Sequence, residues 1–264
     1  MSRPRISETV GDQITALLNK FALTTAAREL VSRFVQAEQE AALPLLLQML
    51  EMEADERRER RITRLRHASK LPPGKTFDTL KESRFPAPLV RRLHELAEGD
   101  FVEEATNVLA FGLPGVGKSH AMCAVAHALV DRGHSVLFVP TYRLVQDLLV
   151  AKRNLDLPRA LRKLDNFAVI LLDDLGYIQQ SAEEAEVLFT LLAERYERRS
   201  VILTSNLVFG DWSRIFRDEM ATAAAIDRLI HHSAILEFDV LSYRAEEAET
   251  RGKRKAARPS EATP

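Results

Sequence analysis

The sequence is poor in the features on which secreted and membrane proteins depend. It contains a single cysteine, Cys123, so it cannot form an internal disulfide or a cysteine-based zinc cluster. No apolar run reaches the roughly 18 residues needed to cross a bilayer, and the densest run, residues 43–50, contains Pro44 and Gln48. The N-terminal stretch MSRPRISETV lacks the apolar segment of a signal peptide. We therefore expect a soluble, cytoplasmic protein with no membrane partner.

The chain also lacks an excess of either charge. Its 37 lysines and arginines stand against 38 aspartates and glutamates, which gives a formal net charge of −1. This balance excludes a protein that coats nucleic acid with its whole surface, but it leaves room for a local basic patch. With 264 residues, 46% of them apolar, the chain is long enough for one folded domain with an appendage, or for two small domains.

The first part of the chain shows helical periodicity and no convincing strand. Apolar residues recur at helical spacing over residues 14–21 and 30–34. Residues 51–66, EMEADERRERRITRLR, combine strong helix formers with Glu–Arg pairs four positions apart. The helix-breaking stretch LPPGKT, residues 71–76, follows. We therefore predict a helical N-terminal domain over residues 1–75, with a role in binding DNA or a partner.

Strands and helices alternate in the remainder. This pattern is typical of an α/β fold with a parallel sheet covered by helices on both faces. We assign residues 76–246 to this core and expect the tail, 247–264, to be disordered, because it has no apolar anchor. The predicted strands are 107–112, 134–139, 167–174, 200–206 and 233–238, and helices are expected over 117–132, 142–152 and 181–198.

The sequence GLPGVGKS, residues 112–119, fits the phosphate-loop pattern G-x-x-x-x-G-K-[ST] in its required context, between a strand and a helix. Glycines let backbone N–H groups approach a triphosphate, and the helix directs its positive end at the same charge. Lys118 is expected to contact the β- and γ-phosphates, and Ser119 to bind Mg²⁺. A chance glycine-rich turn is the weaker alternative. The predicted nucleotide-binding residues are Gly112, Leu113, Pro114, Gly115, Val116, Gly117, Lys118, Ser119 and His120.

Two carboxylates follow the buried strand 167–174. Asp173 and Asp174 come directly after four apolar residues, at the carboxyl end of the strand, where ligands of open α/β sheets bind. We expect Asp173 to hold Mg²⁺ through water, and Asp174 to orient the attacking water as a general base. Alternatively, both aspartates cap the next turn. The phosphate loop earlier in the chain favours the catalytic interpretation.

The next strand also ends in polar residues, Thr204, Ser205 and Asn206. The Asn206 side chain is our candidate sensor of a γ-phosphate or of the attacking water. A turn former after a strand is a serious alternative. We interpret Thr204 and Ser205 as structural.

A helical stretch, AAAIDRLIHH at 223–232, precedes the last strand. Arg228 has no evident place in its own subunit's pocket, so it is a candidate arginine finger that reaches a neighbouring subunit. The alternative is an ion pair with Asp227. We interpret His231 and His232 as solvated helix residues, because no zinc-ligand companions lie at suitable spacing in the sequence.

A basic segment lies in the N-terminal part. Residues 57–75 contain eight basic residues and one acid, Glu59, a local formal charge of +7. No base-reading motif accompanies them, so we expect salt-sensitive, non-specific binding to the backbone of double-stranded DNA. The alternative is a solvated helix paired with the acids of 51–56. The candidate DNA-binding residues are Arg57, Arg58, Arg60, Arg61, Arg64 and Arg66.

Four motifs in order, GLPGVGKSH, VILLDDLGY, LTSNLVFGDW and AAIDRLIHH, resemble the AAA+ ATPases of the IstB type. These are helper proteins of insertion-sequence transposition, related to the DnaC-type replicative helicase loaders. The resemblance covers roughly residues 40–245. It implies a P-loop AAA+ core with a five-stranded parallel sheet, ATP and Mg²⁺ as ligands, and a homo-oligomer joined through ATP-bound interfaces. It also implies double-stranded DNA and a transposase as partners.

The resemblance gives the candidate residues roles. Lys118 and Ser119 match the phosphate loop, Asp173 and Asp174 match the Mg²⁺-binding and water-activating acids, and two further matches are Asn206 as sensor and Arg228 as arginine finger. The 26 residues after Phe238 are too few for the usual helical lid domain, so we expect none. Arg244 is a weaker candidate for a second sensor. Two alternative functions remain, a helicase loader whose partner is the replicative helicase and a nucleotide-gated binding module without hydrolysis.

Overall fold

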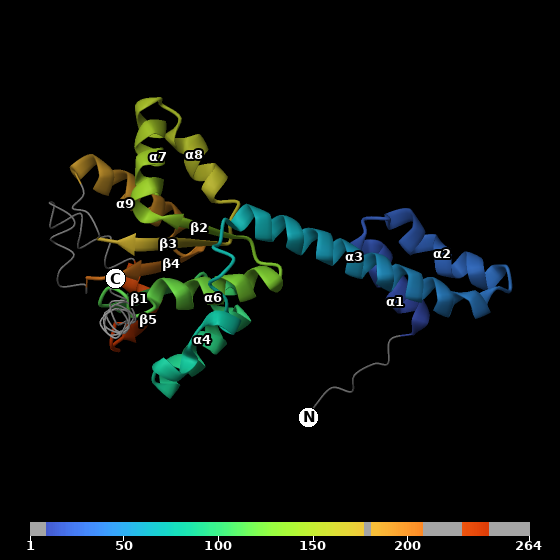
Figure 1. The fold of residues 1–264 in the computed structure, drawn as a ribbon. Coiled ribbons are helices and arrows are strands. Elements are labelled where there is room, and N and C mark those ends of the chain that lie inside the picture. Colours follow the sequence, from blue (N-terminus) through green and yellow to red (C-terminus); the bar gives the residue numbers. More distant parts are fainter. Residues whose placement is uncertain (1–8, 177–180, 208–228, 243–264) are drawn as a thin grey trace, which may run out of the picture. The chain divides into compact units, whose positions relative to one another are not determined.

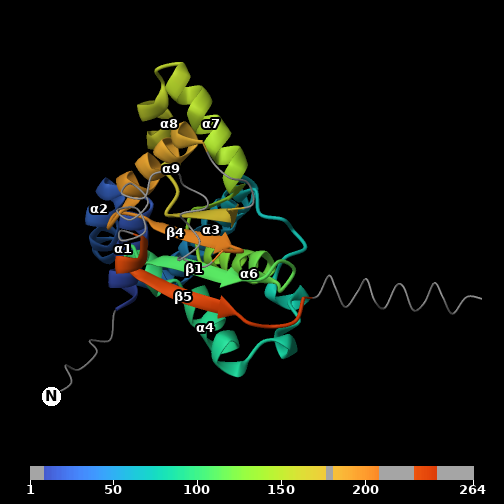
Figure 2. The same cartoon turned by 90° about the vertical axis from the view of Figure 1, so that its left-hand side faces the viewer.

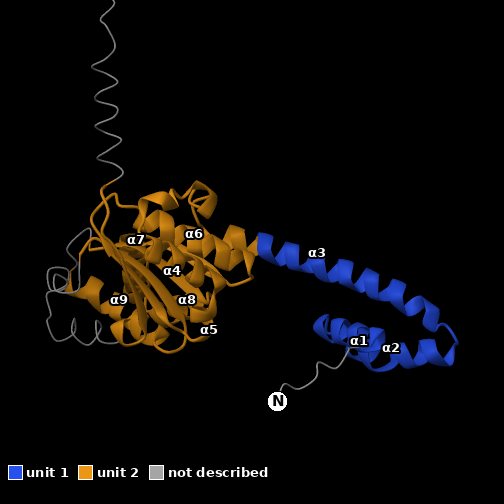
Figure 3. Cartoon of the chain, turned by 90° about the horizontal axis from the view of Figure 1, so that it is seen from below, with its two compact units in different colours: residues 1–63 blue, residues 64–264 orange. Residues whose placement is uncertain are grey.

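The structure is a computed structural model, and it describes residues 9–176, 181–207 and 229–242 (Figure 1). The chain divides into two compact units, residues 1–63 and 64–264 (Figure 3). The division lies inside a helix and earlier than our expected boundary at residue 75. The reason is that Leu65, Leu71 and Phe77 pack against the core of the second unit.

The first unit is helical. The side chain of Thr9 caps the start of helix α1 and accepts a hydrogen bond from the Asp12 backbone at 3.2 Å. A small core of Ile14, Leu18, Ala27 and Leu43 holds the helices together. Helix α3 begins before the predicted segment 51–66, with Pro44 in its first turn, where proline is tolerated. The elements are α1 (Val10–Lys20), α2 (Thr24–Gln36), η1 (Glu40–Ala42) and α3 (Leu43–Ser69), which continues into the second unit.

The second unit contains a five-stranded parallel sheet in the order β2-β3-β4-β1-β5. Figure 2 shows β1 between β4 and β5. All the predicted strands are present, and the predicted parallel sheet is confirmed. The strands are nearly continuous apolar runs because helices cover both faces of the sheet. They are β1 (Asn107–Gly112), β2 (Val136–Pro140), β3 (Val169–Leu175), β4 (Ser200–Ser205) and β5 (Ser233–Phe238).

Side chains that alternate along the strands form two separate cores. Val108 and Ala110 of β1 face the core that includes α4 and α6, whereas Leu109 and Phe111 face the core that includes α7 and α9. Cys123 of α6 is buried in the first core, where burial raises the pKa of its thiol to about 12. The helices are η2 (Phe77–Thr79), η3 (Glu82–Arg84), α4 (Ala87–Glu98), α5 (Asp100–Glu103), α6 (Lys118–Asp131), α7 (Thr141–Arg153), α8 (Leu157–Leu164) and α9 (Ala182–Arg195).

A buried arginine at the end of α9 joins three elements. Arg195 is 2% exposed, and its guanidinium donates hydrogen bonds to the backbone oxygens of Leu164, Phe167, Ala168 and Ser200 at 3.0–3.2 Å. Burial lowers its pKa to about 10, so the group stays charged at neutral pH. The arginine therefore fixes the end of α8 and the starts of β3 and β4 relative to one another.

We expect Arg195→Leu to lower the free energy of unfolding by about 3 kcal/mol, because it leaves buried carbonyl oxygens without donors. Urea unfolding followed by circular dichroism measures the change. The matched control is Arg198→Leu, whose exposed ion pair with Asp165 is worth at most about 1 kcal/mol. Equal losses in the two variants would contradict this role.

Candidate nucleotide-binding site

The phosphate loop connects β1 to α6 through backbone that only glycine adopts easily. Gly112, Gly115 and Gly117 have φ angles of 152°, 82° and 104°. A Cβ atom on Gly112 would lie 2.5 Å from the carbonyl oxygen of Phe238, and one on Gly117 would lie 3.1 Å from Cζ of Phe85. The glycines therefore allow the positive φ angles of the loop, and at Gly112 and Gly117 the missing side chain leaves room for Phe238 and Phe85.

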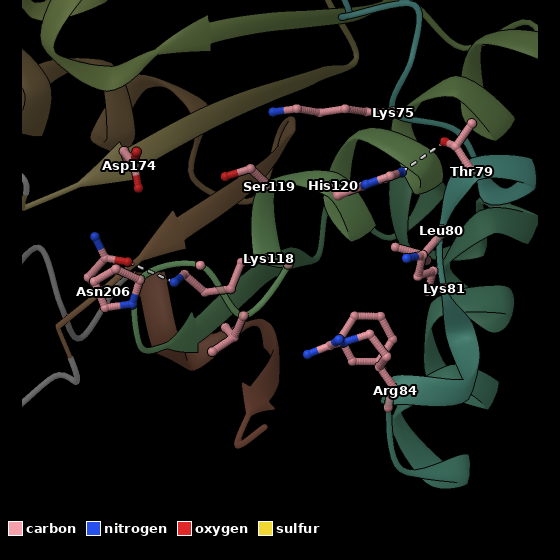
Figure 4. A pocket seen from close by; sticks show the side chains of 15 residues that line it. Lys75, Thr79, Leu80, Lys81, Arg84, Lys118, Ser119, His120, Asp174 and Asn206 are labelled. Carbon is pink, nitrogen blue, oxygen red and sulfur yellow. Dashed lines mark hydrogen bonds between the residues drawn. The ribbon is translucent and has the colours of Figure 1, made fainter. Parts of the chain in front are cut away.

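Lys118, the first residue of α6, is 4% exposed and points back over the loop. Its Nζ donates hydrogen bonds to the oxygens of Gly112 at 2.7 Å and Leu113 at 2.9 Å, and to Oδ1 of Asn206 at 2.7 Å (Figure 4). Lys118 and Asn206 meet because β1 and β4 are neighbours in the sheet, with Phe111 opposite Ser205. The structure thus joins two residues that the sequence analysis selected separately.

The acidic pair is organised by Thr204 of β4. Thr204 Oγ1 donates to Oδ1 of Asp173 at 2.7 Å, and the backbone N–H of Asp174 donates to the same hydroxyl at 2.9 Å. Asp174 has a φ of 60° and is exposed toward the pocket (Figure 4). The hydroxyl of Thr141 binds the Asp173 carbonyl at 2.9 Å. Thr204, which we interpreted as structural, therefore holds both acids in place.

Lys118, Asp174 and Asn206 line a pocket of about 470 Å³, and another wall of this pocket comes from residues that we did not predict. That wall is the segment 75–85, which contains η2 and η3 and lies well before the phosphate loop in the chain. Leu80 and Phe85 make it apolar in part, and both pack with the core that includes α6. The pocket is lined by Lys75, Thr79, Leu80, Lys81, Arg84, Phe85, Pro114, Gly115, Val116, Gly117, Lys118, Ser119, His120, Asp174 and Asn206.

His120 links this wall to the phosphate loop. Its Nε2 lies 3.0 Å from Oγ1 of Thr79 and 3.2 Å from the carbonyl oxygen of Thr76 (Figure 4). The residue after the loop motif therefore binds a segment far away in the sequence. The pattern KTFDTL at 75–80 has no periodicity or ligand spacing that would have revealed this contact.

Two further groups of predicted residues remain. Arg228 and the weaker candidate Arg244 are outside the described residues. On α3, Arg57 binds Glu53 at 2.6 Å and lies over the ring of Phe21, and Arg60 binds Glu56. These two ion pairs are those that the alternative of an acid-paired helix predicts. Arg66 pairs with Asp131 at 2.9 Å, and Arg58, Arg61 and Arg64 are exposed.

With this geometry established, comparison with known proteins gives a consistent result. The sequence matches the model of the family described as IstB-like ATP binding protein over residues 15–251. The chain belongs to this family. It is 43% identical over 228 residues to a Sinorhizobium fredii protein named as an insertion sequence ATP-binding protein, across 85% of this chain and 76% of the relative. A Pseudomonas aeruginosa protein named as an ATP-binding protein of the insertion sequence IS21 is 42% identical, across 72% and 71%.

Solved structures show the same fold at lower identity. The crystal structure of the DnaC helicase loader matches with a TM-score of 0.54 and 20% identity, across 62% of this chain and 97% of the loader. AMPPCP-bound DnaA from Aquifex aeolicus matches with a TM-score of 0.53 and 16% identity, across 74% and 58%. The IstB-like chain therefore has the P-loop AAA+ fold that the sequence motifs indicate, and its family is described as ATP-binding. No helix among the described residues is long and apolar enough to span a membrane.

We expect Lys118→Ala to weaken ATP binding by about 100-fold. This is the loss of two charge-assisted hydrogen bonds, one to each of the β- and γ-phosphates, of about 1.5 kcal/mol each. Titration of a fluorescent ATP analogue measures the dissociation constant. Lys163→Ala, which removes an exposed lysine of α8, is the matched control and should leave binding unchanged. Unaltered affinity in Lys118→Ala would show that nucleotide binds elsewhere.

Proposed function

We propose that this IstB-like protein hydrolyses ATP while bound to double-stranded DNA, and that it assists a transposase as a homo-oligomer. One observation carries the proposal: Lys118, Asn206 and Asp174 line one pocket built on a phosphate loop, and Thr204 holds Asp174 together with Asp173. A module that only binds nucleotide needs the loop, but it does not need a carboxylate pair held at the end of the neighbouring strand.

The donor set fits Mg²⁺. Ser119 supplies a hydroxyl oxygen from the first turn of α6, and Asp173 supplies a carboxylate, and hard oxygen ligands of this kind are those Mg²⁺ prefers. When bound, the ion neutralises charge on the β- and γ-phosphates. Asp174 acts as general base toward the attacking water, because its carboxylate is the exposed one of the pair and lines the pocket.

The bond between Lys118 and Asn206 gives the sensor a physical basis. In this structure Lys118 Nζ is held by three protein oxygens, one of them Oδ1 of Asn206. Phosphate oxygens compete for the same ammonium group, because a phosphate carries more negative charge than an amide or a carbonyl. Nucleotide binding then releases the Asn206 side chain to contact the γ-phosphate or the attacking water.

The segment 75–85 is suited to the base of the nucleotide. It contributes the apolar side chains Leu80 and Phe85 and the basic residues Lys75, Lys81 and Arg84 to the pocket. Apolar surface favours the flat base, whereas the cations favour the phosphates. The wall is fixed to α6 through His120, so base and phosphate subsites are held at a constant spacing.

The remaining steps are assembly and DNA binding. Arg228 is proposed to complete the ATP site of a neighbouring subunit, and the arginines of α3 are proposed to contact the DNA backbone. The names of the relatives place those proteins in insertion sequences, which favours a transposase as partner. The alternative is a loader of a replicative helicase. Co-purification with the transposase encoded beside this gene supports the first partner, and capture of the replicative helicase supports the second.

Hydrolysis is tested with two variants of the acidic pair. We expect Asp174→Asn to lower the rate of phosphate release by at least about 100-fold. Thr204→Val should lower this rate by about tenfold, because the valine lacks the hydroxyl group that holds the two aspartates. Both variants should keep ATP affinity within about threefold of the wild type, which separates catalysis from binding. Wild-type turnover in Asp174→Asn, or no turnover by the wild type with Mg²⁺ and DNA, would refute the ATPase proposal.

DNA binding is tested by its dependence on salt. Affinity for duplex DNA of any sequence should fall steeply with rising salt concentration. In a plot of the logarithm of the binding constant against the logarithm of the salt concentration, the double variant Arg58→Ala, Arg61→Ala should have a shallower slope. The slope should change by about one for each phosphate that the variant no longer neutralises. Fluorescence anisotropy gives the affinities. Arg91→Ala, an exposed arginine of α4, is the control. A slope shared by both variants and the wild type would exclude α3 as the DNA-binding element.

A further inference from the structure

A second group of ligating side chains lies away from the nucleotide pocket. Glu197, His231 and His232 each offer one ligand atom, and these atoms all lie within 4.8 Å of one another. Glu197 follows α9 and precedes β4, whereas the two histidines directly precede β5. Because the sheet is parallel, this group lies at the amino ends of the strands, and the phosphate loop lies at the carboxyl ends.

The distances in this group suit a metal ion. His232 Nε2 lies 3.4 Å from Oε1 of Glu197. Two ligands at about 2.0–2.1 Å from one tetrahedral ion are separated by about 3.4 Å. The rings of His231 and His232 lie 4.5 Å apart at 90°, so the two imidazoles do not stack face to face. The third ligand atom lies within 4.8 Å of the other two, so it has to move by up to about 1.4 Å to reach the same ion.

A neighbouring tyrosine orients one of the ligands. The hydroxyl of Tyr196 lies 3.3 Å from Nδ1 of His231, and in the site proposed below Nε2 of the same ring is the ligand. A hydrogen bond to the other ring nitrogen is the usual way in which proteins fix a ligating histidine.

The backbone around the group is held in place independently of any ion. The carbonyl oxygen of His232 accepts a hydrogen bond from the backbone N–H of Asn107 at 2.7 Å, and the buried Leu229 anchors the turn before it. The side chain of Asn107 also binds the backbone N–H of Val201 at 2.9 Å. Asn107 thus fixes the starts of β4 and β5 against β1, and the exposed side chains of the three ligands extend from backbone close to these fixed starts.

We propose that Glu197, His231 and His232 form a binding site for a borderline divalent transition-metal ion, with Zn²⁺ as the reference. Imidazole ligands suit Zn²⁺, Co²⁺ or Ni²⁺ and disfavour Mg²⁺ and Ca²⁺, so this site does not compete for the ion of the nucleotide pocket. Three protein ligands leave a position open for water. The bound ion cross-links the α9–β4 connection to the residues before β5. His231 and His232 are exposed, as we expected, and the fold adds the exposed Glu197 beside them.

The test uses untagged, full-length protein without nucleotide and Co²⁺ as the spectroscopic probe. We expect Co²⁺ to give the intense visible absorption of low-coordinate cobalt, and Zn²⁺ to displace it and to raise the melting temperature. His232→Ala and His231→Ala should each lose the signal, and Glu197→Gln should weaken Co²⁺ binding by at least about tenfold. The control His67→Ala, an exposed histidine of α3, should bind Co²⁺ as the wild type does.

Retained ATP binding in each variant shows that it is folded, so loss of the signal reports on the ligands. The proposal is overturned if the wild type shows no such absorption, or if His232→Ala binds Co²⁺ as tightly as the wild type does. It is also overturned if a phosphate-loop variant, Ser119→Ala, removes the signal, because the ion then lies in the nucleotide pocket. These outcomes do not depend on ATP hydrolysis or on a transposase.

Discussion

The arrangement of the nucleotide site depends on the hydrogen bond between Lys118 Nζ and Oδ1 of Asn206, at 2.7 Å. It joins the helix that follows β1 to the end of β4, and these strands are hydrogen-bonded neighbours. A buried ammonium group needs oxygen partners, and here it takes them from the loop backbone and from the candidate sensor. In the function that we propose, nucleotide binding exchanges the partners of this one charged group, which couples phosphate recognition to the position of Asn206.

The same edge of the sheet explains the acidic pair. Thr204 lies near the end of β4, next to β3. Its hydroxyl group donates a hydrogen bond to the Asp173 carboxylate and accepts one from the backbone N–H of Asp174. Thr204 and the two aspartates lie on β4 and β3, which are adjacent parallel strands. The backbone hydrogen bonds between these strands, and between β4 and β1, therefore fix the positions of the carboxylates, of Asn206 and of the phosphate loop. Rigid strands at this edge give the precision that catalysis requires.

The opposite edge of the sheet has its own organising residue. Asn107 joins the starts of β1, β4 and β5, and Arg195 joins the end of α8 to the starts of β3 and β4. Polar side chains that satisfy backbone groups at strand starts are expected there, because the first residues of a ladder lack some of their partners. This fixed edge brings Glu197 beside the two histidines, and it separates the proposed metal site from the nucleotide by the full length of the strands.

The sequence by itself determined the strands, the phosphate loop, the acidic pair and Asn206, because apolar runs and a glycine-rich motif are local signals. Only the tertiary structure decided which distant residues meet. The wall at 75–85, the role of Thr204 and the approach of Glu197 to His232 arise from packing between segments far apart in the chain. The division of the chain inside α3 has the same origin. A helix continues through both units without any local break, and only the packing of Leu65 and Leu71 assigns its end to the second.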